Sequence, residues 1–159
     1  MNASEHPRLR VSVDTNVLLR ATLNEPGLEN QSRAARLVLA SGRWEVVVAD
    51  LAITEYVHAL EAHYRLERAT ICDLVSALIR PEHVVCDKSV ITAALTHYAA
   101  RPRLSFDDCF LVEYAQARRA VPLLTFDQEF AAQHPAAGLV NLGDESGAGS
   151  GGAAKASEA

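Results

Sequence analysis

The stretch LRVSVDTNVLLRA, residues 9–21, decides the fold of this 159-residue chain. Residues 9–13 alternate apolar and polar side chains, which predicts a strand, and residues 17–21 are typical of a helix. Asp14, Thr15 and Asn16 therefore stand at a strand-to-helix turn, the place where open α/β sheets bind ligands. Asp14 or Thr15 could equally serve only to cap the helix. The positions of the acidic residues further along the chain distinguish between these two interpretations.

The rest of the body alternates short strands with helices, which predicts an α/β fold. We expect a parallel sheet of four to five short strands between two helical layers. Besides residues 9–13, strands are expected at 44–49, 83–86, 122–126 and 138–142. Helices are expected at 31–40, 51–64, 67–79, 90–100, 107–119 and 128–133. Residues 1–142 form one predicted domain, and residues 143–159, mostly Gly, Ala and Ser, a predicted disordered tail.

The composition, with 49% hydrophobic and 22% charged residues, is that of an ordinary globular protein. The chain has no apolar run long enough to span a membrane and no signal-peptide core at its N-terminus, so we expect a cytoplasmic protein. Cys72, Cys86 and Cys109 form no C-x-x-C pair and are expected to be reduced thiols in the core. The six histidines show no zinc-ligand spacing.

The net charge of −5 does not by itself exclude a nucleic-acid substrate. Residues 143–159 contribute −2 of it and the body −3. If four carboxylates of the body bind metal, the other groups of the body sum to about +1. The charge therefore permits a substrate approached through divalent cations and disfavours tight, nonspecific binding to phosphates.

Glu55 stands in a helical, largely apolar stretch. Leu51 and Ala59, four residues away on either side, share its helix face, so we expect that face to be buried. A buried carboxylate has to be paired, protonated or bound to a cation. The alternative is a glutamate at the edge of the apolar stripe that reaches water.

Asp107 and Asp108 open another helix. Asp108 shares the packed face of Leu111, Val112 and Ala115, whereas Asp107 points elsewhere. One of the two is expected to be structural, and we assign the cap to Asp107.

Asp127 repeats the position of Asp14, because it ends a hydrophobic strand and precedes a helix. Asp50 and Asp87 also follow strands, but they stand directly before helices and are predicted to be caps. Four acids could thus converge at one sheet edge: Asp14, Glu55, Asp108 and Asp127. Crowded carboxylates need cations, and oxygen-only ligands favour Mg²⁺ or Mn²⁺. Such a site suits metal-assisted hydrolysis of phosphodiester bonds.

Four motifs in this order resemble those of the PIN-domain nucleases. They are residues 13–19, Thr54-Glu55, residues 105–108 with Ala115, and residues 124–130. The similarity covers roughly residues 9–142, and the compact domain looks like the toxin subunit of a VapBC-type toxin–antitoxin pair.

The resemblance implies a PIN-like three-layer α/β/α fold and an endoribonuclease. It implies a Mg²⁺ or Mn²⁺ site made by Asp14, Glu55, Asp108 and Asp127. Asn16 and Thr125 are implied as supporting polar residues. Three features depart from the family pattern. Glu113 stands where the family often has a small apolar residue, and is either an extra acid at the site or a surface charge. The Asp107-Asp108 doublet leaves two candidates for one ligand, and the glycine-rich tail is not part of the pattern.

Two other functions compete with this one. A haloacid-dehalogenase-type phosphatase needs a second aspartate two residues after the first, where this chain has Asn16. A catalytically weak PIN-like RNA-binding module is disfavoured because all four acids are present. Five arginines are candidates for RNA phosphate contacts, or are merely solvated: Arg20, Arg101, Arg103, Arg118 and Arg119.

Two protein partners are expected. A small antitoxin follows from the resemblance, and a basic side chain from it could block an acidic metal pocket. A homodimer follows from apolar side chains that a small sheet should leave uncovered on the helices at 51–64 and 67–79. These side chains are Ile53, Tyr56, Val57, Leu60, Ile71, Leu74, Val75, Leu78 and Ile79.

Overall fold

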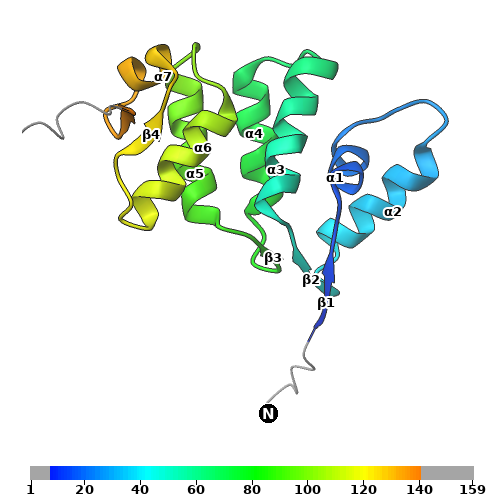
Figure 1. Ribbon diagram of the computed structural model, residues 1–159. Coiled ribbons are helices and arrows are strands. Elements are labelled where there is room, and N and C mark those ends of the chain that lie inside the picture. Colours follow the sequence, from blue (N-terminus) through cyan, green and yellow to red (C-terminus); the bar gives the residue numbers. More distant parts are fainter. Residues whose placement is uncertain (1–7, 141–159) are drawn as a thin grey trace, which may run out of the picture.

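The computed structural model describes residues 8–140, which form seven α-helices, one π-helix and five short strands (Figure 1). The strands are β1 (Leu9–Ser12), β2 (Trp44–Val47), β3 (Val84–Val85), β4 (Leu123–Thr125) and β5 (Ala137–Leu139). The α-helices are α1 (Thr15–Thr22), α2 (Glu29–Ala40), α3 (Asp50–His58), α4 (Arg68–Ile79), α5 (Lys88–Ala100), α6 (Phe106–Ala117) and α7 (Gln128–Gln133). The expected α/β class is confirmed. The predicted tail at 143–159 lies outside the described residues.

All strand pairs are parallel, as expected, and they are distributed over two sheets. The first sheet has the order β1-β2-β3, with Leu9 opposite Trp44 and Val46 opposite Val84. The second pairs β4 with β5, with Leu123 opposite Ala137. Strands of two to four residues carry few alternating side chains, so their sequence does not specify which strand they join. In this structure β1 and β4 belong to different sheets.

The helix expected at 51–64 changes its winding partway along. α3 continues into the π-helix η1 (Ala59–His63), where the amide of Tyr64 donates to the carbonyl of Ala59 over 3.0 Å. Asp50 lies within the first turn of α3, whose N-cap is Ala49, so its prediction as a cap was wrong. Asp87 does cap α5, because its carboxylate accepts from the Val90 amide over 3.3 Å.

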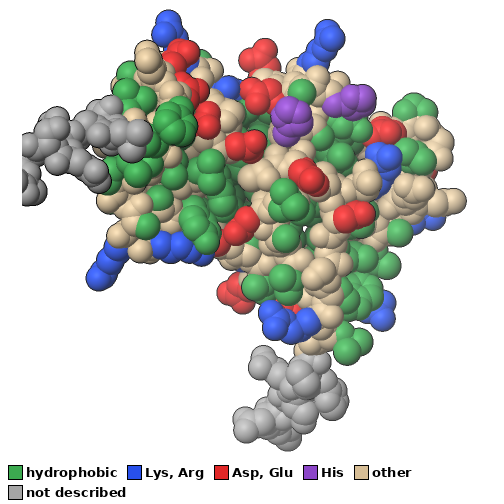
Figure 2. Space-filling model, viewed as in Figure 1, with side chains coloured by type: hydrophobic (Ala, Val, Ile, Leu, Met, Phe, Trp, Pro, Cys, Tyr) green, Lys and Arg blue, Asp and Glu red, His purple; other side chains and the backbone are tan. Residues whose placement is uncertain are grey.

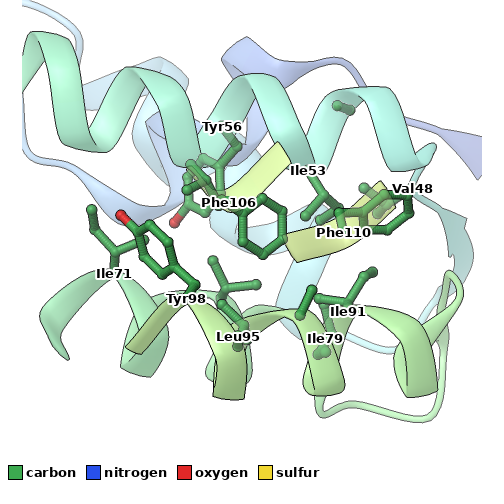
Figure 3. Packing of buried hydrophobic residues seen from close by; sticks show 14 of the residues in the cluster. Val48, Ile53, Tyr56, Ile71, Ile79, Ile91, Leu95, Tyr98, Phe106 and Phe110 are labelled. Atoms are coloured by element: carbon green, nitrogen blue, oxygen red, sulfur yellow. The ribbon is translucent and has the colours of Figure 1, made fainter. Parts of the chain in front are cut away.

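The hydrophobic core lies mainly among α3, α4, α5 and α6 (Figure 3). The rings of Tyr98 and Phe106 meet edge to face with centroids 5.8 Å apart, and Ile53, Tyr56 and Ile71 are completely buried. Burial of each such side chain stabilises the fold by about 1.5–3 kcal/mol.

The same core overturns the premise of the dimer prediction. Of the nine apolar side chains expected to be left uncovered, seven are buried in the chain's own core, and Leu74 and Leu78 are partly buried. Helix-on-helix packing covers them, and the small sheet is not required to do so. Large apolar side chains are exposed elsewhere, with Leu51 at 68% and Phe126 at 84% of their full accessible area.

The three cysteines are free thiols, as expected, and Cys109 is completely buried. Loss of hydration raises the pKa of each thiol, to about 11 for Cys109. Among residues 8–140 no helix is both long and apolar enough to cross a membrane.

Candidate active site

Asp14 lies at the carboxyl end of β1 and caps α1. Its Oδ1 accepts a hydrogen bond from the Val17 amide over 3.0 Å. The next residue, Thr15, donates from its hydroxyl to Oε2 of Glu55 on α3, over 2.7 Å. Because the cap uses only one carboxylate oxygen of Asp14, capping and ion binding are compatible roles. The first strand and α3 thus bring two of the four predicted acids into one neighbourhood.

Glu55 lies on the exposed face of α3, so the expectation that it shares a buried face was wrong. Leu51, one turn earlier, is 68% exposed. The buried face consists of Ala52, Ile53 and Tyr56 with their neighbours. An exposed carboxylate is accessible to a cation from solvent.

The Asp107-Asp108 doublet has the opposite division of roles from the expected one. Ser105 is the N-cap of α6, and its hydroxyl accepts from the Asp108 amide over 3.1 Å, while Asp108 Oδ2 accepts from the Ser105 amide over 3.4 Å. Asp108 therefore closes a capping box, and the assignment of the cap to Asp107 was wrong. One oxygen of Asp108 remains outside this box.

Asp107 faces the C-terminal end of α3. Desolvation of its carboxyl group raises the pKa of Asp107, and the charges of Asp108 and Glu61 add to the rise, while His58 opposes it. Since His58 lies three residues after Glu55 on α3, the doublet adjoins the helix that carries Glu55.

Asp127 caps α7, with its Oδ1 accepting from the Phe130 amide over 2.9 Å. Its own amide donates to the Thr125 hydroxyl over 3.0 Å. In Figure 1, α7 and α1 lie on opposite sides of the helices α3 to α6. The structure thus joins Asp14 to Glu55 through Thr15 and sets the doublet beside α3, while Asp127 follows β4 of the second sheet. The strand ends that carry Asp14 and Asp127 therefore belong to different sheets and not to one sheet edge.

The four acids share an electrostatic property. Within residues 8–140 none of them has a Lys, Arg or His nitrogen within 4.0 Å, although Glu25 pairs with Arg20 over 2.5 Å. Figure 2 shows acidic side chains spread across the middle of the face toward the viewer. Uncompensated carboxylate oxygens are the donors that hard divalent cations prefer, so the donor set fits Mg²⁺ or Mn²⁺.

Glu113, on the same helix as the doublet, is largely buried and pairs with His97, so it is not the free surface charge that was one of its two expected roles. It meets His97 and His134, so that one ligand atom from each of the three lies within 4.8 Å of the others. Sequence reasoning missed this group because the three residues come from separate elements and follow no metal-binding spacing. Within residues 8–140 it is also the only such group of three His, Cys, Asp or Glu residues.

Most of the candidate RNA-binding arginines are engaged within the protein. Arg103 pairs with Glu129 over 3.4 Å, and Arg118 stacks on the Tyr114 ring at 3.4 Å. Arg20 pairs with Glu25, and Arg101 donates to the Gln133 carbonyl over 3.1 Å. The side chain of Arg119 forms no hydrogen bond or ion pair within the described part of the chain.

These features define an α/β domain with exposed, unpaired acids at strand ends and on an adjoining helix, the kind of acidic surface that metal-dependent nucleases use. The PIN-domain family model matches residues 11–133, and the chain belongs to the PIN-domain family. The PIN domain is a nuclease-type fold. A comparison with curated proteins gave no match.

Proposed function

We propose that this protein is a Mg²⁺- or Mn²⁺-dependent endoribonuclease and the toxin component of a VapBC-type toxin–antitoxin pair. The observation that carries the proposal is the hydrogen bond from Thr15 to Glu55. It joins the acidic turn after β1 to the acid of α3 in a chain that matches the PIN family over most of its length.

Asp14, Glu55, Asp108 and Asp127 would hold the metal, with Asp107 as a second candidate from the doublet. When bound, the metal supplies an activated water and stabilises the leaving oxygen. The chain's own side chains prepare the site. The Thr15 hydroxyl orients the Glu55 carboxylate over 2.7 Å, and the Thr125 hydroxyl fixes the backbone at Asp127. Exposed Asn16, in the first turn of α1, supplies a supporting amide.

The RNA strand would approach through the bound cations, because the acids repel phosphates in their absence. Arg119 is the most available of the five arginines for a phosphate contact, since its guanidinium forms no hydrogen bond or ion pair within residues 8–140. The other four arginines would first have to leave their protein partners.

Cleavage of RNA by the purified chain tests the proposal. We expect cleavage with Mg²⁺ or Mn²⁺, none with excess EDTA, and a loss of activity of at least about tenfold in Glu55→Gln. Glu82→Gln, at another exposed acid, is the matched control and should be fully active. Equal activity in both variants would reject the site. Sequencing RNA fragments after induced expression without an antitoxin would identify the target.

A partner that inhibits the enzyme would place an arginine or lysine among these acids, where it competes with the metal for the carboxylate oxygens. We expect expression of the chain alone to be toxic, and co-expression with the adjacent open reading frame to be harmless. Harmless expression of an active enzyme without any partner contradicts the toxin role.

We also propose a homodimer, now resting on exposed apolar side chains away from α4. Leu51, Leu111 and Phe126 are 68%, 49% and 84% exposed, and such side chains are commonly buried across two-fold interfaces. Light scattering should give twice the mass of the chain, and a monomer at every concentration tested would contradict the dimer.

A second function is favoured by the division of the strands over two sheets, since Asp14 follows β1 of one sheet and Asp127 follows β4 of the other. An incompletely gathered acidic site suits an RNA-binding module that does not cleave. In that case RNA binding would persist in EDTA, and no fragment would form with either metal.

A further inference from the structure

His97, Glu113 and His134 form a polar cluster outside the candidate active site. They come from α5, α6 and the residue that ends α7. Nε2 of His97 lies 2.8 Å from Oε1 of Glu113, and the rings of the two histidines have centroids 4.6 Å apart at 64°. One ligand atom from each of the three residues lies within 4.8 Å of the other two. Three segments that are distant in the sequence therefore present two imidazoles and a carboxylate to one point.

His134 is the feature that hydrogen bonding within the protein does not explain. Its side chain is almost wholly buried, at 2% exposure, and its Nε2 has no hydrogen-bond partner within the described residues. The other ring nitrogen, Nδ1, accepts from the Ala136 amide over 3.2 Å. A buried polar atom without a partner costs about 1–3 kcal/mol. A ligand at Nε2 would remove this cost.

The Glu113 carboxylate favours a cation at the cluster, whereas the neighbouring Arg101 guanidinium opposes one. Burial lowers the pKa of His134, and the charges of His97 and Arg101 lower it further. The Glu113 side chain is only 12% exposed and has no Lys or Arg nitrogen within 4.0 Å. Its polar contacts are the His97 ring and the Gln116 side-chain amide, which donates to it over 2.8 Å. A largely buried carboxylate whose negative charge is not neutralised by a Lys or Arg side chain is stabilised by a bound cation.

We propose that His97, Glu113 and His134 bind a divalent transition-metal ion, with Zn²⁺ the best match. Two imidazole nitrogens and one carboxylate oxygen are a common zinc ligand set, and water completes the tetrahedron. The oxygen-only acids near α3 instead suit Mg²⁺ or Mn²⁺. The protein thus carries two sites of different chemistry.

Arg101 sets the affinity of this site. In the metal-free protein it contacts Nδ1 of His97, and the Ala136 amide contacts Nδ1 of His134. A metal-bound histidine ordinarily donates from its second nitrogen. Metal binding at Nε2 would move the proton of each ring to Nδ1, so the Arg101 guanidinium would have to leave His97 and the Ala136 amide would have to turn away from His134. Removal of that positive charge and competing contact should tighten binding.

A bound ion would link α7 to α5 and α6. Because Asp127 caps α7, the bound ion would also restrain the segment that carries one of the candidate catalytic acids. The role is structural, and it is independent of whether the chain cleaves RNA.

Calorimetric titration of the full-length, metal-free and tag-free chain with Zn²⁺ tests the proposal. We expect one Zn²⁺ per chain, binding weakened at least about tenfold by His97→Gln and by Glu113→Gln, and binding tightened by Arg101→Met. His63→Gln, at an exposed histidine, and Asp14→Asn, in the candidate active site, should bind as the wild type does. Co²⁺ should give the intense visible absorption of a tetrahedral nitrogen-containing site.

Three outcomes overturn the proposal. The first is a dissociation constant for Zn²⁺ above about 100 µM, which corresponds to weak binding. The others are an equal loss of binding in His63→Gln and Glu113→Gln, and a loss of binding in Asp14→Asn alone. The last result would place the zinc at the acids near α3. If His134→Gln does not fold, Glu113→Gln carries the test. Its near-ultraviolet circular dichroism should match that of the wild type, and Zn²⁺ should raise the melting temperature of the wild type only.

Discussion

Substitution of Asp14 separates its two roles, because asparagine can replace the cap but cannot replace the charge. The Asp14 carboxylate makes one capping bond, to the Val17 amide over 3.0 Å. Asparagine caps helices about as well as aspartate. It loses only the favourable interaction of a negative charge with the helix N-terminus, roughly 0.3 kcal/mol at an exposed site. Alanine loses that interaction and the cap, together about 1.3 kcal/mol.

These free energies translate into melting temperatures that can be resolved. For a domain of this size 1 kcal/mol corresponds to about 3 °C, so Asp14→Asn should melt within roughly 1 °C of the wild type and Asp14→Ala about 4 °C lower. Cleavage of RNA in Mg²⁺ should be lost in both variants. The control is Asp87→Asn, which alters the equivalent cap of α5 over 3.3 Å and should keep full activity.

The assay is thermal denaturation beside RNA cleavage with freshly purified protein. If Asp14→Asn cleaves RNA at the wild-type rate, Asp14 does not bind a catalytic metal. If Asp14→Asn melts as low as Asp14→Ala, the capping bond is not what the carboxylate contributes to stability.

Three further predictions concern other parts of the chain. Asp108→Asn should reduce RNA cleavage more than Asp107→Asn, and equal or reversed losses would show that Asp107 is the ligand. Deletion of residues 145–159 should leave the melting temperature and activity unchanged, since a segment poor in apolar side chains cannot offset its ordering entropy; a drop of several degrees would show that it docks. Cys109, whose pKa is raised to about 11, should react with a thiol reagent at pH 8 only after unfolding, and rapid labelling of the native protein would contradict its burial.

Helices were more predictable than strand pairing. The apolar periodicity of α4 and α5 set those helices within about two residues of their observed bounds, because each buries a continuous stripe. The sheet arrangement was not predictable in the same way. β3 has two residues and β4 three, so pairing depends on how the helices pack.

The face of Glu55 was misassigned for a related reason. α3 carries apolar residues around more than half of its circumference, so Leu51 four residues earlier does not indicate which side is buried. The error on Asp108 was avoidable, because Ser105 stands three residues before it and such a spacing predicts a capping box. The cluster of His97, Glu113 and His134 is formed by tertiary packing, and no local sequence pattern predicts it.

The π-turn at Ala59–His63 bears on how this chain tolerates changes in length. A π-helical turn holds one residue more than the corresponding α-helical turn. Here its exposed members are Ala62 and His63, while Leu60 is completely buried. Removal of Ala62 should convert the turn to ordinary α-helix and keep the residues on both sides in register. The segment between α3 and α4 is therefore a point where the chain can lose or gain one residue without unfolding the core. Loss or gain of a residue within α3 itself would instead rotate Tyr56 and Val57 away from the core.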